Sequence, residues 1–419
     1  MARTSGVAWL TLVALMLVMA NEVAIPLDYL ARPMLVAVLP AIAIGVASTA
    51  LGRFATLGAV VVSPLVLIPE LWPVAVGLLA LEIGVWLIQR WRHREGIPVG
   101  RFAFVTVIVL ILVSAVRLSP LVLDYFAPAS TIGAHDGPPV YLILVDGYPR
   151  ADSLETLGID NGAFISELEA RGFEHYPEAT SAHEWTHRTL QAMIAGSASG
   201  IPDETGTSQD ERALRSQLQL PARFLAIDPP TGHVTMRGGA HVSAGGTNDF
   251  EARLLGTSVV GALAPEWAAS LVGDSLRDHF EGSLDLIVES SSDRTFAHLM
   301  APHPPFFYAD GPAKCWPAGC DIFDIAAQEL EISVSEWASQ MDRHLPAVND
   351  RLVLTVDRLL ATHPDAVIVL FSDHGGRYGG GNDESHHSFL MARTPGNPGL
   401  FSSEPHPHAL LRLLEEAYP

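Results

Sequence analysis

Charged residues and cysteine are scarce in this sequence. Only 17% of its 419 residues are charged and only two are cysteine, whereas an average soluble domain carries about 25% charged residues. Basic residues are the scarcer sign, because 25 Lys and Arg stand against 46 Asp and Glu, for a formal net charge of −21. With 49% hydrophobic residues and a mean hydropathy of +0.27, the low charge excludes an intrinsically disordered chain. The shortage of basic residues excludes a basic nucleic-acid-binding protein.

The apolar residues concentrate in the first 127 positions. This part contains eight Arg and six Asp or Glu, a net charge of +2, so the remainder must carry −23 to give the total of −21. Its apolar runs lie at 7–24, 34–51, 55–69, 73–88 and 103–118. A membrane-spanning helix needs roughly 20 apolar residues. The first two runs provide that length, while the middle two are short and bounded by proline, and fit either two tight spans or one broken hairpin. A cleaved signal peptide explains one run but not five, so we predict a membrane domain of about five helices at 1–127.

Arginine placement predicts the orientation of this membrane domain. The loop at 89–101 holds four of its eight arginines, and loops rich in Lys and Arg remain in the cytoplasm. One further span then places the rest of the chain outside. The stretch at 128–137 contains Pro and Gly and is typical of a linker. The sequence thus predicts a multi-pass protein of the cell membrane with an acidic extracytoplasmic domain at 138–419.

Both cysteines, Cys315 and Cys320, lie in this predicted external domain. Two cysteines five residues apart can close a small disulfide loop in an oxidising compartment. Two unrelated thiols are the alternative. Because the sequence has no second cysteine pair, a cysteine zinc site is not expected.

The external domain alternates short apolar runs with helical stretches. Continuous apolar runs at 140–145 (VYLILV) and 366–371 (AVIVLF) are typical of strands buried on both faces of a parallel sheet. Further strands are predicted at 294–300 and 388–392, and helices at 161–171, 186–194, 337–360 and 408–417. This alternation predicts an α/β domain with a mainly parallel sheet sandwiched by helices. The functional site is then expected at the carboxyl ends of the strands.

Acidic and imidazole side chains follow the two buried strands. Asp146 comes directly after VYLILV, and Asp373 and His374 come one residue after AVIVLF. Two carboxylates and an imidazole form a mixed ligand set for one divalent cation, Zn²⁺ or Mn²⁺ in the first place and Mg²⁺ or Ca²⁺ as alternatives. The other interpretation of Asp146 is a turn aspartate before glycine.

The segment at 179–196 places polar residues before an apolar helix. Ser181 or Thr186 could cap this helix. A hydroxyl at a helix N-terminus also lies where free N–H groups and the helix dipole stabilise an anion, and a Thr186 alkoxide bound to a metal would be a usable nucleophile. The spacing alone leaves cap and nucleophile open.

Four histidines complete the candidate residues. His298 and His303 flank the end of a predicted strand, and the two prolines after His303 force extended backbone. A rigid loop that carries an imidazole suits substrate binding, whereas His298 is interpreted as a buried, hydrogen-bonded core residue. His386 and His387 are adjacent in a polar loop, where such pairs are often merely solvated.

Together these motifs resemble those of the alkaline phosphatase/sulfatase superfamily. The resemblance is greatest to its membrane-anchored sulfatase-like proteins, which include lipoteichoic acid synthases and lipid A phosphoethanolamine transferases. LVDGYPRADSL resembles the first motif, AHEWTHRTLQAMIAG the nucleophile helix, FAHLMAPHPPF the histidine motif and FSDHGG the final metal motif. With the later histidine pair, the motifs extend in order over about 140–392.

The resemblance implies a metal centre and a nucleophile. Asp146, Asp373 and His374 take the metal-ligand places. Thr186, 40 residues after Asp146, takes the place of the nucleophile and fourth ligand.

The resemblance also implies roles for three histidines. His303 takes the place of the residue that contacts the transferred group. His386 or His387 falls where the family carries a further active-site histidine; we assign His386 to protonation of the leaving oxygen and His387 to substrate binding.

Three departures narrow the expected chemistry. The formylglycine-type signature, Cys or Ser followed by x-Pro-x-Arg, is absent. No clear additional Asp lies near His298, which favours one catalytic metal over two. The transferases often carry Glu at the first ligand place, where this chain has Asp146.

The predicted function is metal-dependent transfer or hydrolysis of a phosphate ester through Thr186. Transfer would be of the phosphoethanolamine or phosphoglycerol type, to a cell-envelope lipid or glycan. The expected partners are membrane lipids and a lipid-linked or glycan phosphate-ester substrate, with no nucleic acid, and the chain is expected to act as a monomer. The alternatives are a sulfate-ester or phosphodiester hydrolase of the same superfamily, or an inactive member that binds the envelope. A transporter has little support, because the apolar runs carry few charges.

Overall fold

The computed structural model describes residues 2–22, 32–35, 37–49, 137–199, 201, 220–221, 223–230, 240–309, 333–378 and 383–419. The chain divides into two compact units. The first is Met1–Ala127 with Phe250–Ala268, and the second is Pro128–Asp249 with Ala269–Pro419. The predicted spans at 55–118, most of the predicted linker and both cysteines lie outside the described residues.

The described part of the first unit is helical. Helix α1 (Ala2–Glu22) packs against α3 (Val38–Thr49), and the indole of Trp9 donates a hydrogen bond to the carbonyl of Met34 at 3.1 Å. Helices α11 (Asp249–Thr257) and α12 (Val259–Leu263) come from the later segment. Within the residues that the structure describes, no helix combines the length and the apolar character needed to cross a membrane.

The second unit is built on one seven-stranded sheet with the order β2-β7-β6-β1-β5-β3-β4. Its strands are β1 (Val140–Val145), β2 (Glu174–His175), β3 (Leu225–Asp228), β4 (Ala240–Ser243), β5 (Arg294–Leu299), β6 (Val367–Phe371) and β7 (Leu390–Arg393). The five strands from β6 to β4 are parallel, and β7 and β2 pair antiparallel at one edge. The prediction of a mainly parallel sheet is therefore confirmed.

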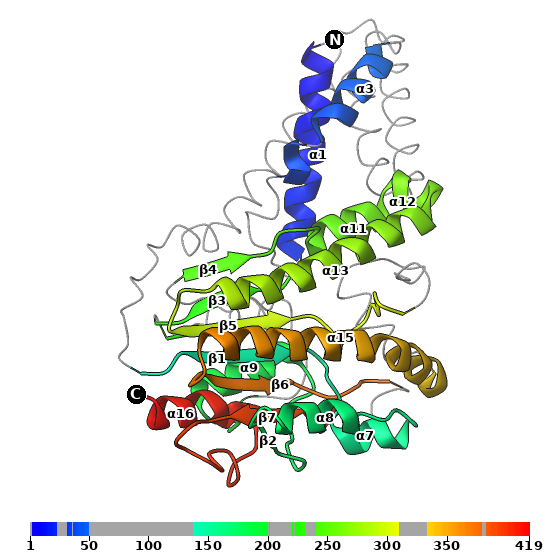
Figure 1. The fold of residues 1–419 in the computed structure, drawn as a ribbon. Coiled ribbons are helices and arrows are strands. Elements are labelled where there is room, and N and C mark those ends of the chain that lie inside the picture. Colours follow the sequence, from blue (N-terminus) through cyan, green and yellow to red (C-terminus); the bar gives the residue numbers. More distant parts are fainter. Residues whose placement is uncertain are drawn as a thin grey trace, which may run out of the picture. The chain divides into compact units, whose positions relative to one another are not determined.

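Helices cover both faces of this sheet (Figure 1). One face packs α7 (Ala151–Thr156), α8 (Gly162–Glu169), α13 (Pro265–Glu289) and α15 (Val334–Thr362). The other face packs α9 (Thr186–Ala195) and α16 (Pro407–Ala417).

Strand β1 shows why its sequence is continuously apolar. Tyr141, Ile143 and Val145 belong to the core on one face, and the alternate residues belong to the core on the other. Each buried aliphatic side chain of this size contributes roughly 1.5–3 kcal/mol. A strand between two helical layers has no solvent-facing side, so both sets of side chains must be apolar.

The predicted elements of the second unit are found within a few residues of their expected bounds. Helix α9 ends at Gly196, whose left-handed backbone (φ 67°) closes the helix with its N–H bonded to Met193. No element was expected from the sequence for β3, β4 and α11 to α13, which lie in 200–292.

Candidate active site

Three neighbouring parallel strands, β6, β1 and β5, end at the same edge of the sheet. Asp146 follows β1, Asp373 and His374 follow β6, and His303 lies in the loop after β5. The backbone ties two of these segments together, because Asp146 N–H donates to Leu299 and His303 N–H donates to Asp146, at 2.9 and 3.0 Å. The sheet thus brings together residues that are up to 228 positions apart in the chain.

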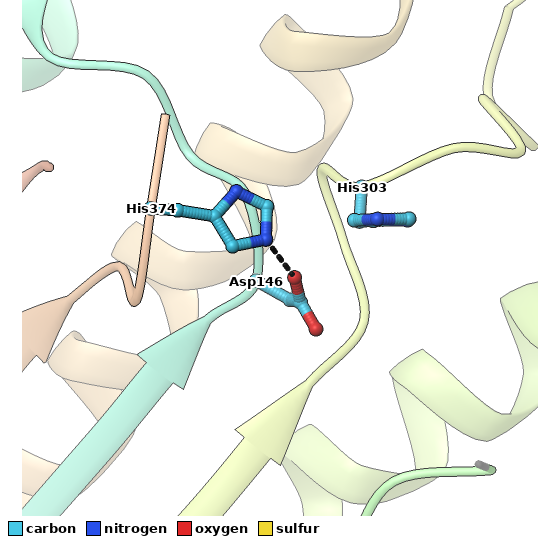
Figure 2. A group of neighbouring side chains, drawn as sticks. All are labelled: Asp146, His303 and His374. Carbon is cyan, nitrogen blue, oxygen red and sulfur yellow. Dashed lines mark ion pairs between the residues drawn. The ribbon is translucent and has the colours of Figure 1, made fainter. Parts of the chain in front are cut away.

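Asp146, His303 and His374 form a buried cluster (Figure 2). One potential ligand atom from each lies within 4.8 Å of the other two. Asp373 is fully buried beside them, and its Oδ2 lies 3.4 Å from His374 Nε2.

The hydrogen bonds of His374 define the chemistry of this cluster. Its Nδ1 lies 2.7 Å from the carbonyl oxygen of Gly375, so Nδ1 carries the proton and Nε2 presents a lone pair. Facing Nε2 are Asp146 Oδ1 at 3.5 Å and Asp373 Oδ2 at 3.4 Å. These distances exceed those of N–H···O bonds. The two carboxylate oxygens therefore each lie within 3.5 Å of Nε2 with no hydrogen bond to it, and a divalent cation would stabilise these three electron-rich atoms.

The second oxygen of each carboxylate is held by the protein. Asp373 Oδ1 accepts from the N–H of Gly147 at 3.1 Å, and Asp146 Oδ2 accepts from His298 Nε2 at 2.8 Å. Both carboxylates thus have one oxygen fixed by a donor and the other directed at His374 Nε2.

His303 differs from these residues because both of its ring nitrogens have partners. Nδ1 donates to the carbonyl of Pro304 at 2.8 Å, and Nε2 lies 2.9 Å from Arg377 Nη2. Since guanidinium only donates, His303 Nε2 is the acceptor. His303 therefore lies beside the three converging atoms but is engaged elsewhere, which favours Asp373 over His303 as the third ligand.

Gly147 must be glycine for this cluster to close. Its φ is +63°, a left-handed conformation that side chains disfavour. A Cβ at this position would also meet the rings of both His303 and His374 at 3.3 Å.

Thr186 is the first residue of α9, but neither it nor Ser181 caps the helix. The N-cap is Trp185, which makes no side-chain capping bond, and the prediction of a Ser181 or Thr186 cap was wrong. Ser181 is turned into the preceding loop, where its hydroxyl bonds to the carbonyl of His183 at 2.7 Å. The Thr186 hydroxyl is half-buried and makes no hydrogen bond within the described part of the chain.

The first turn of α9 is attached to the loop after β6. Thr189 Oγ1 donates to the carbonyl of Asp373 at 3.1 Å. The guanidinium of Arg377 lies 4.7 Å from the ring centroid of Trp185. These contacts place the helix start that carries Thr186 next to the segment that carries Asp373 and His374.

The adjacent histidines diverge. His386 Nδ1 lies 3.0 Å from the carbonyl of Ser181, in the loop before α9. His387 Nδ1 lies 3.0 Å from the hydroxyl of Ser153 on α7. Both imidazoles are therefore tied to protein groups, and only His386 faces the segment that leads to Thr186.

Two residues of this site, His298 and Arg377, were not predicted from the sequence to be functional. His298 was interpreted as a core histidine; it is indeed buried, and its partner is Asp146. Arg377 was not singled out, although it follows His374 by only three residues in the same loop.

The loop after His303 is fixed from behind by α15. His344 on this helix is fully buried, and its Nδ1 accepts the N–H of Tyr308 at 3.1 Å. Its ring packs against the rings of Phe306, Phe307 and Tyr308.

We expect His344 to make the fold sensitive to acid. Burial lowers the pKa of His344 to about 3, whereas the pKa of the same side chain in the unfolded protein is about 6.5. The unfolded state therefore takes up a proton first, and stability is lost as pH falls from about 6.5 toward 3, by about 1.4 kcal/mol per pH unit. His344→Asn keeps an acceptor for Tyr308 but does not titrate. Between pH 7 and pH 5 it should lose about 2 kcal/mol less stability than wild type.

Chemical denaturation of the full chain in detergent measures this difference. His363→Asn, at the half-exposed C-terminal end of α15, is the matched control and should follow wild type. The same pH dependence in all three proteins would contradict the role of His344.

No family model and no curated protein matches this sequence. Among solved structures, the chain is similar to the C-terminal periplasmic domain of EcEptC from Escherichia coli in complex with Zn (11% identity, TM-score 0.38, covering 70% of this chain and 86% of that one). It is also similar to the integral membrane protein lipooligosaccharide phosphoethanolamine transferase A (EptA) from Neisseria meningitidis, with 13% identity and a TM-score of 0.34, covering 92% of this chain and 71% of that one. A third similar structure is the phosphonate monoester hydrolase SpPMH from Silicibacter pomeroyi, with 15% identity and a TM-score of 0.38, covering 67% of this chain and 73% of that one.

Of these three proteins, one is named as a phosphoethanolamine transferase and one as a phosphonate monoester hydrolase. Their TM-scores lie below 0.5, so the activities of those proteins are not carried over to this chain.

Proposed function

We propose that this chain is a metal-dependent enzyme that transfers or hydrolyses phosphate esters through Thr186. One observation carries the proposal: single oxygens of Asp146 and Asp373 lie 3.5 and 3.4 Å from the lone-pair nitrogen His374 Nε2 in a buried site. That site lies at the carboxyl ends of adjacent parallel strands, where α/β proteins place their ligands.

Asp146, Asp373 and His374 would hold the divalent metal, with Thr186 as the fourth ligand. Two carboxylates, an imidazole and a hydroxyl suit Zn²⁺ or Mn²⁺, and Mg²⁺ or Ca²⁺ are the alternatives. When bound, the metal supplies Lewis-acid chemistry, which lowers the pKa of a bound hydroxyl and neutralises anionic oxygens.

Thr186 acts as the nucleophile from the N-terminus of α9. Its hydroxyl would lose its proton to water as its oxygen forms a bond to phosphorus, while the bond between phosphorus and the leaving oxygen breaks. His386, which faces the loop before Thr186, gives a proton to that leaving oxygen. In the second step the oxygen of an acceptor alcohol or water forms a bond to phosphorus and the bond to the Thr186 oxygen breaks, while the acceptor returns a proton to His386. An alcohol acceptor makes the enzyme a transferase and water makes it a hydrolase.

The other two predicted histidines are proposed to line the side of the site where the substrate binds. A ring nitrogen of His303 lies within 4.8 Å of ligand atoms of Asp146 and His374. His387 is proposed to contact the substrate from the side of Ser153, whose hydroxyl lies 3.0 Å from its Nδ1.

The substrate is proposed to be a lipid-linked or glycan phosphate ester of the cell envelope. The apolar composition of residues 1–127 supports an anchor in the cell membrane, and the arginines at 89–101 support an extracytoplasmic catalytic domain. The chain is proposed to act as a monomer. A sulfate-ester hydrolase remains the second candidate for the same metal site, but the absence of the formylglycine-type signature disfavours it.

A single membrane experiment tests both the chemistry and the anchoring. Membranes from cells that express the chain should hydrolyse bis-p-nitrophenyl phosphate, and the activity should stay in the pellet after a high-salt wash. A chelator should abolish it, and Zn²⁺ or Mn²⁺ should restore it. Membranes without the protein are the control. Activity that survives complete removal of metal would refute the proposal, and activity released by salt would refute the anchoring.

A further inference from the structure

Arg377 is a buried arginine immediately behind the candidate metal site. Only 3% of it is exposed. Its Nη2 donates to His303 Nε2 at 2.9 Å, and its guanidinium packs over the ring of Trp185 at 4.7 Å. Its Nη1 approaches the carbonyl of Glu184 at 3.4 Å. A positive charge therefore lies one imidazole away from Asp146 and His374.

Arg377 changes what His303 can do. Because Nδ1 of His303 donates to Pro304 and Nε2 accepts from Arg377, the ring is neutral and has no N–H left for an anionic oxygen. An anion that arrives beside His303 would meet a guanidinium whose orientation is already fixed by stacking on Trp185. Such a planar group binds two oxygens of a phosphoryl or sulfuryl group at once.

The negative charge of the domain makes Arg377 more important for binding an anion. Residues 128–419 carry a net charge of −23, which repels an anionic ester at long range. Binding then depends on positive charge within the site itself. Arg377 supplies such a charge from a buried position beside His303.

We infer that Arg377 is the substrate-binding residue for the anionic oxygens of the transferred group, and that His303 is a positioning residue that holds the guanidinium. The substrate class is therefore an ester that keeps a negative charge on the transferred phosphoryl or sulfuryl group. This inference rests on the proposed function of the same site.

Inorganic phosphate is the probe for this role, and calorimetry of the full chain in detergent is the measurement. Arg377→Met should weaken phosphate binding about ten- to a hundredfold, because hydrogen bonds between charged groups are lost. Arg377→Lys keeps the charge but loses the planar fork, so its loss should be intermediate. Arg171→Met removes an arginine that pairs with Asp357 at the surface and should bind phosphate like wild type.

Metal content and thermal unfolding separate binding from structure. Weaker phosphate binding at unchanged metal content and unchanged unfolding temperature supports the inference. Wild-type phosphate affinity in Arg377→Met overturns it, and so does loss of the metal together with phosphate binding. If Arg377→Met does not fold, Arg377→Lys decides by the same criteria. A failure of the proposed function looks different: phosphate binding would still depend on Arg377, but no ester would be turned over.

Discussion

Thr186→Ala is expected to abolish turnover while the metal stays bound. The variant removes the oxygen that attacks phosphorus but leaves Asp146, Asp373 and His374 in place. Loss of a nucleophile lowers kcat by about a thousandfold or more. Hydrolysis of bis-p-nitrophenyl phosphate by the purified full chain, measured together with its metal content, tests this. Full activity in the variant would exclude Thr186 as the nucleophile.

Thr362→Ala is the matched control for this experiment. Thr362 lies at the exposed end of α15, where its hydroxyl bonds to the carbonyl of Arg358 at 3.2 Å. Its loss should leave the kinetics unchanged. Mass spectrometry of the intact wild-type protein after exposure to native lipid adds a direct readout, because a covalent adduct on Thr186 would identify the transferred group.

Asp373→Asn is expected to remove both metal and activity. The amide keeps the size of the side chain and one oxygen, but it loses the negative charge that faces His374 Nε2 at 3.4 Å. Loss of a supporting residue around a metal already costs about ten- to a hundredfold in affinity, so loss of a charged ligand should cost at least a hundredfold. Metal content after dialysis and the rate of ester hydrolysis should both fall to background.

Without metal, Asp373→Asn is expected to be more stable than wild type. In the metal-free wild type, two carboxylate oxygens face a nitrogen lone pair, whereas the amide introduced by Asp373→Asn can donate to that lone pair. The metal-free variant should therefore unfold at a higher temperature than the metal-free wild type. Asp357→Asn, which breaks only a surface pair with Arg171, is the control for the loss of a carboxylate. An Asp373→Asn variant that retains stoichiometric metal would rule out Asp373 as a ligand.

The α/β architecture was readable in the sequence because its signal is local. A strand between two helical layers must be apolar at every position, as in β1 and β6, and an amphipathic helix must repeat near every 3.6 residues, as in α15. In the region 200–292, helix α13 carries such a repeat, with Leu276, Phe280, Leu284 and Ile287 at the core, although no helix was predicted there. Strands β3 and β4 have only four residues each, and β4 is half-exposed, so their identity depends on the pairing of β3 with β5 and of β4 with β3, and not on their own pattern.

Hydrogen-bond partners were decided by the tertiary structure. A hydroxyl before a helix is usually a cap, yet the Ser181 hydroxyl bonds to the carbonyl of His183 and the hydroxyl of Thr189, and Trp185 takes the N-cap position. The two adjacent histidines could not be separated by spacing either. His386 and His387 point to different elements because the short 3-10 helix at Asp383–His386 ends between them.

By itself, the sequence determined which residues could meet. Asp146, Asp373 and His374 each follow a fully buried strand, and parallel strands in one sheet end at a common edge. Only the tertiary structure decided how their atoms face each other, which oxygen of each carboxylate His298 and Gly147 hold, and that Arg377 lies against His303. The physical reason is that strand position follows from local hydrophobic pattern, whereas side-chain partners come from segments far apart in the chain that only the closed sheet brings into contact.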